Sequence, residues 1–197
     1  MTYNKKKHLL TIEKIVIIMI TLVFADCEMK VSPEHIEESR SRTDLVHFSL
    51  LLAQDSELAA ERELRTIVHT RENKVYQFEA DIQIPQKLED FEEMLVKSYH
   101  GDLPEGVIYS EETLMEALES EYGEKIVLSP KGKRIDPIEM FSRGKDYVII
   151  IGGFPEGDFV SPVYDWADKT ISISDRLMKP WSVTAEMLVG YRYCSLE

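Results

Sequence analysis

Continuous apolar runs along the chain predict the strands of a buried sheet. Residues 147–151 form the clearest run, of the kind found in the middle of a parallel sheet that is covered on both faces. Shorter runs at residues 125–128 and 170–173 predict two more strands. Residues 15–25 predict the first strand of the chain, because they are rich in β-branched side chains.

Apolar positions spaced by three or four residues predict helices between these strands. The spacing is clearest for Leu88, Phe91, Leu95 and Tyr99, which would lie on one side of a helix. Capping residues predict further helices that begin at residues 32, 43 or 44, 110, 136 and 182. The runs at 64–69 and 75–79 predict an antiparallel hairpin instead. Because strands and helices alternate in the second half, the fold class is α/β.

The amino terminus combines three lysines with an apolar run, as a signal peptide does. Lys5, Lys6 and Lys7 precede the run at residues 15–25. The run is too short to span a bilayer, although its length suits the core of a signal peptide. We favour the strand interpretation because of the β-branched residues. We therefore expect residues 1–14 to be flexible, residues 1–197 to form a single domain, and the protein to be cytoplasmic with no membrane contact.

Composition is that of an ordinary globular protein. Apolar residues make up 44% of the chain and charged residues 30%. Cys27 and Cys194 are far apart and show no Cys or His ligand spacing, so we expect neither a disulfide framework nor a metal site. The net charge of −13 does not suggest nucleic-acid binding, and a polyanionic partner would have to meet a local basic patch.

Two loops after predicted strands are the first places to look for a ligand site. In open α/β sheets small ligands bind beyond the carboxyl ends of the strands, which here means residues 152–157 and 173–178. The spacing Gly-Gly-x-x-x-Gly from Gly152 to Gly157 matches neither the dinucleotide fingerprint nor the phosphate loop. Glycines let the backbone approach a ligand closely, but they also occur simply because a turn needs them.

Several segments in a fixed order carry a resemblance to a known family. Residues 146–159 and 168–175 resemble the cofactor-binding loops of the pseudouridine N1-methyltransferases of ribosome biogenesis, which belong to the SPOUT, or α/β-knot, class. Residues 42–51, residues 67–70 and the pair Ile84-Pro85 occur upstream in the order that this family shows. The resemblance covers nearly all of the chain from Thr21 onward.

The resemblance implies a fold, a cofactor and partners. The fold is a SPOUT-type knotted α/β fold with a mostly parallel sheet, an antiparallel hairpin and a C-terminal trefoil knot. The cofactor is S-adenosyl-L-methionine, and the substrate is N1 of a pseudouridine in small-subunit rRNA. The protein would act as a homodimer, with ribosomal proteins or assembly factors as further partners. The positions that would contact the cofactor are Leu128, Gly152, Gly157, Ile173, Ser174, Asp175, Arg176, Leu177 and Met178.

Catalysis in this class rests on positioning, because the sulfonium of the cofactor is already a good leaving group. The resemblance names no catalytic acid or base in this chain. It places Arg42 on the RNA and makes Asp44 the residue that holds this arginine. Two residues of opposite charge at this spacing are also common at the start of any helix.

Departures from the family pattern fall mainly on the RNA-binding positions. Gln83, Gln86 and Asp90 stand where the family has arginines that contact rRNA, and Arg176-Leu177 replaces a Tyr-Pro pair in the last cofactor loop. A neighbouring cation, namely Lys87, Lys97 or Arg71, is an alternative RNA contact. Two other functions therefore stay open, which are a ribosome-assembly protein with weak or no catalysis and a methyltransferase for another RNA.

The remaining aromatic and histidine residues have a structural interpretation and a functional one. Phe154, Phe159 and Trp166 could anchor a dimer interface or fill the core of one chain. His47 and His69 lie in segments that resemble the family, but we favour histidines that are hydrogen-bonded within the core.

Overall fold

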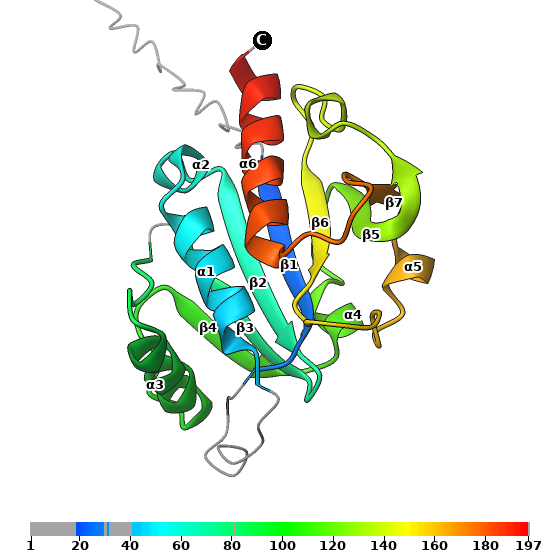
Figure 1. Ribbon diagram of the computed structural model, residues 1–197. Helices are drawn as coiled ribbons and strands as arrows, with labels where there is room; N and C mark the ends of the chain where they lie inside the picture. The colour runs from blue at the N-terminus through cyan, green and yellow to red at the C-terminus, as the bar shows by residue number, and fades with distance from the viewer. Residues whose placement is uncertain (1–18, 30, 32–40, 81, 197) are drawn as a thin grey trace, which may run out of the picture.

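A computed structural model describes residues 19–29, 31, 41–80 and 82–196. These residues build one seven-stranded sheet with the strand order β4-β3-β2-β1-β6-β5-β7 and helices on both faces (Figure 1). The elements in chain order are β1 (Ile20–Cys27), α1 (Thr43–Gln54), α2 (Glu57–Ala60), β2 (Leu64–Thr70), β3 (Lys74–Phe78), α3 (Leu88–Tyr99), β4 (Val107–Glu111), α4 (Leu114–Ala117), β5 (Glu124–Arg134), the 3-10 turn η2 (Pro137–Glu139), β6 (Tyr147–Gly152), α5 (Val163–Trp166), β7 (Lys169–Ser172) and α6 (Pro180–Leu196).

The centre of the sheet is parallel. Strand β1 pairs in parallel with β2 on one side and with β6 on the other, and β5 pairs in parallel with β6 and β7. Strands β2, β3 and β4 form an antiparallel meander, so the predicted hairpin and the mostly parallel sheet are both confirmed. Strand order alone does not decide whether the chain threads through its own loop, and the trefoil knot stays a prediction.

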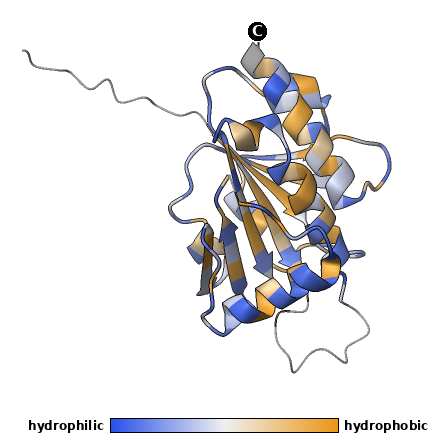
Figure 2. Ribbon diagram, turned by 90° about the vertical axis from the view of Figure 1, so that its left-hand side faces the viewer, coloured by the Kyte–Doolittle hydropathy of each residue, from blue (hydrophilic) through white to orange (hydrophobic). Residues whose placement is uncertain are grey.

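Each face of the sheet has its own apolar core. On β1, Leu22 and Phe24 pack with α1, α3 and α6, whereas Val23 and Ala25 pack with α4 and α5 on the opposite face. This division follows from the strand period of two, which turns successive side chains to opposite faces. Figure 2 shows the central strands mostly in the hydrophobic colour. The sheet is therefore a rigid, fully covered platform for the loops at its carboxyl edge.

The first predicted strand forms the middle of the sheet. Residues 20–27 are all buried, whereas residues 15–18 and the predicted helix at residue 32 lie outside the described residues. No helix in the described part of the chain is both long and apolar enough to cross a membrane. Cys27 and Cys194 are free thiols.

The helix predicted through Leu114 is present, but its predicted start at Ser110 is wrong. Ser110 belongs to the edge strand β4, where it pairs with Val75, and its hydroxyl donates to Glu112. Helix α4 begins at Leu114, because Thr113 caps it and forms a capping box with Glu116 through reciprocal side-chain and backbone hydrogen bonds. Pairing of β4 with β3 therefore keeps Ser110 extended, and the cap of the helix moves to Thr113.

Two other predicted elements differ in length. The helix predicted from Asp136 to Gly144 is only the 3-10 turn η2, whose first residues Asp136 caps by accepting from the backbone N–H of Ile138. The strand predicted at residues 125–128 continues through a bulge to Arg134, because its second part pairs again with β7.

Candidate functional site

A cavity of about 360 Å³ lies at the carboxyl edge of the sheet. It is bounded by the segments that follow Leu128 in β5, Ile151 in β6 and Ile171 in β7, and by the start of α6. Helix α1 contributes Leu45. Sites at this edge are usual for α/β sheets, because loops from neighbouring parallel strands end side by side there.

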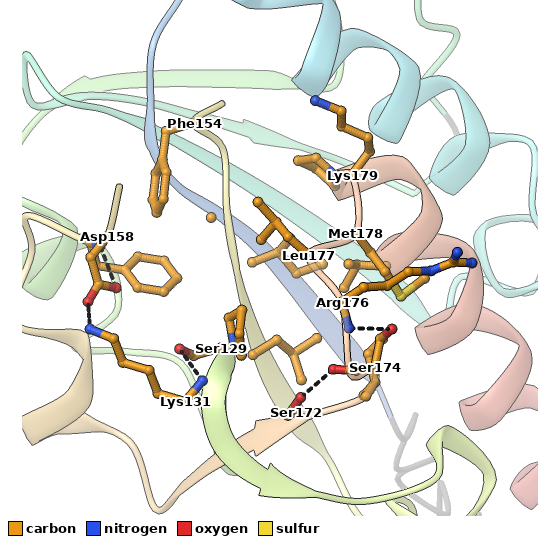
Figure 3. A pocket seen from close by; sticks show the side chains of 18 of the residues that line it. Ser129, Lys131, Phe154, Asp158, Ser172, Ser174, Arg176, Leu177, Met178 and Lys179 are labelled. Atoms are coloured by element: carbon orange, nitrogen blue, oxygen red, sulfur yellow. Dashed lines mark hydrogen bonds and ion pairs between the residues drawn. The ribbon is translucent and has the colours of Figure 1, made fainter. Parts of the chain in front are cut away.

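Eight of the nine positions expected to contact the cofactor line this cavity. They come from three separate segments and are Leu128, Gly152, Gly157, Ile173, Ser174, Arg176, Leu177 and Met178. Asp175 differs, because its side chain is 96% exposed and its carboxylate faces the guanidinium of Arg134 at 3.7 Å. Figure 3 shows the loop from Ser172 to Lys179 along one side of the cavity and Phe154 with Asp158 on the other.

The glycines of this site have different structural reasons. Gly157 has a φ of +95°, a backbone conformation that other residues adopt only with strain. Gly152 has ordinary backbone geometry, but a Cβ placed on it would lie 2.8 Å from the ring of Phe154. Glycine at residue 152 therefore lets this phenylalanine fold back over the end of β6 and form part of the cavity lining.

A buried carboxylate holds the loop that follows β6. Asp26, at the end of β1, accepts hydrogen bonds at Oδ2 from the backbone N–H groups of Val160 (2.7 Å) and Ser161 (2.9 Å). Its Oδ1 accepts from the hydroxyl of Ser161 at 2.6 Å. The side chain is 1% exposed. Asp26 thus joins the central strand to a loop more than 130 residues away in sequence.

These donors keep Asp26 ionised despite its burial. Burial by itself raises the pKa of a carboxyl group, but hydrogen bonds from His69, Ser161 and the backbone N–H of Val160 lower the pKa of Asp26 from 3.8 to about 2. His69 Nδ1 lies 3.5 Å from Oδ1, and its Nε2 lies 3.2 Å from Oδ1 of Asn73. His69 is a buried residue whose Nε2 is hydrogen-bonded, as predicted, whereas its Nδ1 lacks a hydrogen bond of ordinary length.

A second polar network closes the cavity wall between β5 and the loop after β6. Lys131 Nζ pairs with Asp158 Oδ2 at 2.5 Å, and the hydroxyl of Tyr164 donates to Asp158 Oδ1 at 2.6 Å. Ser129 Oγ lies 3.1 Å from the same hydroxyl. We did not expect Lys131, Ser129 or Asp158 from the sequence. No local pattern joins residues that are 27 or more positions apart, and only the fold brings them together.

Arg42 and Asp44 form a bidentate ion pair at the start of α1. Arg42 Nε donates to Asp44 Oδ1 at 2.8 Å, and Nη2 donates to Oδ2 at 2.9 Å. Hydrogen bonds from Arg42 lower the pKa of Asp44. The next residue, Leu45, lines the cavity, whereas Arg42 and Asp44 do not.

The segment with Gln83, Gln86 and Asp90 lies farther along the same side of the sheet. All three side chains are exposed. The segment is docked on α1 by His47, whose Nε2 lies 2.7 Å from the carbonyl oxygen of Pro85 and whose ring stacks on Phe91 at 4.8 Å. His47 is buried, so its predicted core role is also confirmed.

The described residues hold no group of three or more His, Cys, Asp or Glu side chains arranged as metal ligands. The fold and the site together define a SPOUT-type α/β protein, with its ligand cavity between loops at the carboxyl edge of a mostly parallel sheet. A solved structure of Nep1 from Archaeoglobus fulgidus, bound to S-adenosylhomocysteine, has this fold, with a TM-score of 0.73 and 19% identity over 90% of this chain and 99% of that chain.

The chain belongs to the EMG1/NEP1 methyltransferase family. The model of that family matches residues 4–192. Ribosomal RNA small subunit methyltransferase Nep1 of Methanothrix thermoacetophila is 32% identical over 166 residues, which cover 81% of this chain and 74% of the relative. The protein of the same name from Thermoplasma acidophilum is 32% identical over 160 residues, covering 77% and 70%.

The role of Asp26 can be tested by Asp26→Asn. The amide would place an N–H group against the donors of residues 160 and 161, so the free energy of unfolding at pH 7 should fall by about 2 kcal/mol, the equivalent of the pKa shift. Because the folded pKa is depressed, the carboxylate stabilises fully above pH 4 and loses this effect as the pH falls toward 2. Urea unfolding of both proteins between pH 7 and pH 2.5 should show the difference shrinking below pH 4. Asp165→Asn, at an exposed position of α5, is the control, and a difference that does not change with pH would contradict the assignment.

Proposed function

We propose that this protein is an S-adenosyl-L-methionine-dependent methyltransferase that modifies N1 of a pseudouridine in small-subunit rRNA and contributes to ribosome biogenesis in the cytoplasm. The observation that carries the proposal is the cavity at the carboxyl edge, because eight positions assigned to the cofactor from sequence line it together. Family membership and the names of the relatives support the same reaction.

The cavity suits a nucleoside with a thioether or sulfonium side chain. Its volume falls within the range of small-molecule sites, and its lining combines apolar side chains such as Leu128, Ile173 and Met178 with loop backbone. Apolar walls can hold the flat adenine ring, while N–H and C=O groups of the loops select its edge. Gly157, with its positive φ and nothing within 4 Å of a Cβ built on it, leaves room for such an approach.

When bound, the cofactor supplies an activated methyl group on a sulfonium leaving group. The chain itself has to orient the acceptor base and exclude water from the cavity. Arg42 is suited to hold the RNA, because Asp44 fixes its guanidinium through two hydrogen bonds and leaves its remaining N–H donors available. Asp44 acts through Arg42 and is a positioning residue.

One observation favours a second candidate, a ribosome-assembly protein with weak or absent catalysis. Gln83, Gln86 and Asp90 offer no positive charge to RNA, and α3 continues this surface with Glu89, Glu92 and Glu93. Binding of RNA to this surface would release few counterions, so the surface would add little to RNA affinity. The intact cavity still favours the enzyme, since a protein that only binds RNA has no need for it.

We also propose that the protein forms a homodimer through α1 and α6. These helices pack side by side on one face of the sheet (Figure 1) and expose Phe48 (51%), Val189 (63%) and Tyr193 (46%). Trp181 extends this apolar surface by contacting Phe48 edge-on at 5.7 Å. A second copy of the chain is the occupant that we propose for this surface. In a two-fold dimer the same apolar surface of each copy would cover that of the other. Leu177, on the loop that lines the cavity, is a further exposed apolar side chain (74%).

The aromatic residues first considered as dimer anchors pack within one chain instead. Phe159 contacts both Phe154 and Tyr164 edge-on, at 5.3 and 5.7 Å. Trp166 lies under the ammonium group of Lys125 at 4.5 Å. Of the two interpretations left open by the sequence, these contacts favour the core.

Cofactor binding is expected to depend on Gly157. S-adenosylhomocysteine at a hundred times its dissociation constant should stabilise the fold by about 2.7 kcal/mol, measured by thermal unfolding and titration calorimetry. Gly157→Val should abolish this effect, because valine resists the φ of +95°. Gly144→Val is the matched control, since Gly144 also has a positive φ with open space around it but lies outside the cavity. Equal loss of binding in both variants would contradict a specific role for Gly157.

Methyl transfer is tested on a small-subunit rRNA fragment that contains a single pseudouridine. The wild type with S-adenosyl-L-methionine should add one methyl group to this fragment and none to the same fragment with uridine, because only pseudouridine has a free N1. Mass spectrometry of the digested RNA gives the position. Arg42→Ala should lower kcat/KM by tenfold or more, equivalent to about 1.4 kcal/mol. Cofactor binding without any methylation would favour the assembly protein.

The dimer is tested by Val189→Glu combined with Tyr193→Glu. Two charges in the middle of a self-complementary apolar surface should convert the dimer to a monomer at micromolar concentration in sedimentation equilibrium. Ile108→Glu changes an equally exposed apolar residue on the edge strand β4 and should leave the dimer intact. A monomeric wild type in the presence of S-adenosylhomocysteine would contradict the dimer.

A further inference from the structure

Two cations at the cavity have no carboxylate partner among the described residues. Arg176 and Lys179 both line the cavity and are both exposed. Three other basic side chains are neutralised, since Arg42 pairs with Asp44, Arg71 with Glu28, and Lys131 with Asp158. Arg176 and Lys179 therefore carry the charge that is left over at the cavity.

This excess of positive charge stands out in an acidic protein. The whole chain has a net charge of −13, yet the charged residues that line the cavity are Lys131, Arg176 and Lys179 against Asp158 alone. After Lys131 and Asp158 cancel, two positive charges remain. Lys179 also directly precedes α6, and its carbonyl accepts the first hydrogen bonds of that helix, whose amino end adds partial positive charge. The mouth of the cavity favours an anion.

We propose that Arg176 and Lys179 bind phosphate groups of the RNA beside the target nucleotide, and so replace the basic contacts that are missing at Gln83, Gln86 and Asp90. The inference rests on the proposed function, because it assumes that RNA is the partner at this cavity. In this arrangement the RNA backbone binds the loop after β7, which directly borders the cofactor site.

The alternative cations near the glutamine positions are less suited. Lys97 pairs with Glu93 at 2.8 Å, and Arg71 is held by Glu28 and lies over the ring of Phe154 at 5.4 Å. Lys87 has no ion pair among the described side chains, but it precedes a helix whose first turn contains Glu89 and Asp90. The loop after β7 contains one carboxylate, Asp175, but it faces Arg134 at 3.7 Å, so Arg176 and Lys179 keep positive charge that α3 does not offer.

Phosphate explains this arrangement better than the carboxylate of a bound cofactor. In Figure 3, Lys179 extends from the loop toward α1, whereas Arg176 extends in a different direction and away from Phe154. Side chains that diverge in this way cannot grip one small carboxylate together. They suit successive phosphates of a strand that passes across the mouth of the cavity, since phosphates are spaced along the backbone and each needs its own cation.

The test compares the salt dependence of RNA binding in wild type and in Arg176→Ala with Lys179→Ala. The probe is the pseudouridine-containing small-subunit rRNA fragment, titrated between 50 and 300 mM KCl. Loss of two phosphate contacts should reduce the slope of log K against log salt by about 1.4, at about 0.7 for each contact in single strands. Lys179→Ala alone changes no position expected to contact the cofactor, so its affinity for S-adenosylhomocysteine, measured by calorimetry, should stay within twofold of the wild type.

Arg143→Ala with Lys145→Ala is the matched control. Both residues are exposed cations, but they precede β6 and so lie at the opposite edge of the sheet. This variant changes the net charge equally and should keep the wild-type slope. An equal loss of slope in both double variants would overturn the inference, because it would reflect net charge alone.

Three other results also overturn the inference. These are an unchanged slope in the Arg176 and Lys179 variant, a loss of cofactor affinity without a change in RNA binding, and a wild type that does not bind the RNA. Failure of the proposed function is distinguishable, because it would appear as a wild type that binds no S-adenosylhomocysteine and transfers no methyl group, whatever its RNA salt slope.

Discussion

The carboxylate of Asp26 is the interaction on which the cavity wall depends. It sits at the end of the central strand β1, almost wholly buried, and accepts three hydrogen bonds from Val160 and Ser161. A buried charge without such donors would be strongly unfavourable, so Asp26 and the loop stabilise each other. Because β1 is the central, fully buried strand of the sheet, its end gives the loop after β6 a defined position. The cavity requires this, since that loop supplies Phe154, Gly157 and Asp158.

Around this anchor, the cavity is assembled from contacts that each join two different loops. Phe154 folds over Gly152, and Arg71 packs against the outer side of its ring. Lys131 and Asp158 connect the loop after β5 to the loop after β6. The loop after β7 is the exception, because its Arg176 and Lys179 form no ion pairs with described residues and are exposed. One side of the cavity is thus held by paired charges, while the other offers charge to a partner.

This division reconciles an acidic protein with an RNA substrate. A net charge of −13 gives no long-range attraction to a polyanion, so binding has to depend on a small number of well-placed cations. The two cations of the last loop line the cavity, and Arg42 is fixed by Asp44 at the start of α1, whereas the surface of α3 is acidic. Placing the basic contacts at the cofactor site ties RNA affinity to the correct position of the target base. It also means that fewer contacts hold the RNA, which suits release of the product.

The sequence by itself determined the α/β class, the parallel centre of the sheet, the hairpin and the loops that form the cavity. Those features depend on short-range patterns, namely the apolar runs at residues 15–25 and 147–151 and the glycines at 152 and 157, together with a resemblance spread over most of the chain. Only the tertiary structure decided which distant residues meet. Asp26 with Ser161 and Lys131 with Asp158 are pairs that no local pattern connects. It also decided that Ser110 lies in a strand, since pairing with Val75 outweighed its capping tendency. Arg176 and Lys179 were present in the sequence from the start, but their lack of carboxylate partners among described residues is a property of three-dimensional neighbours.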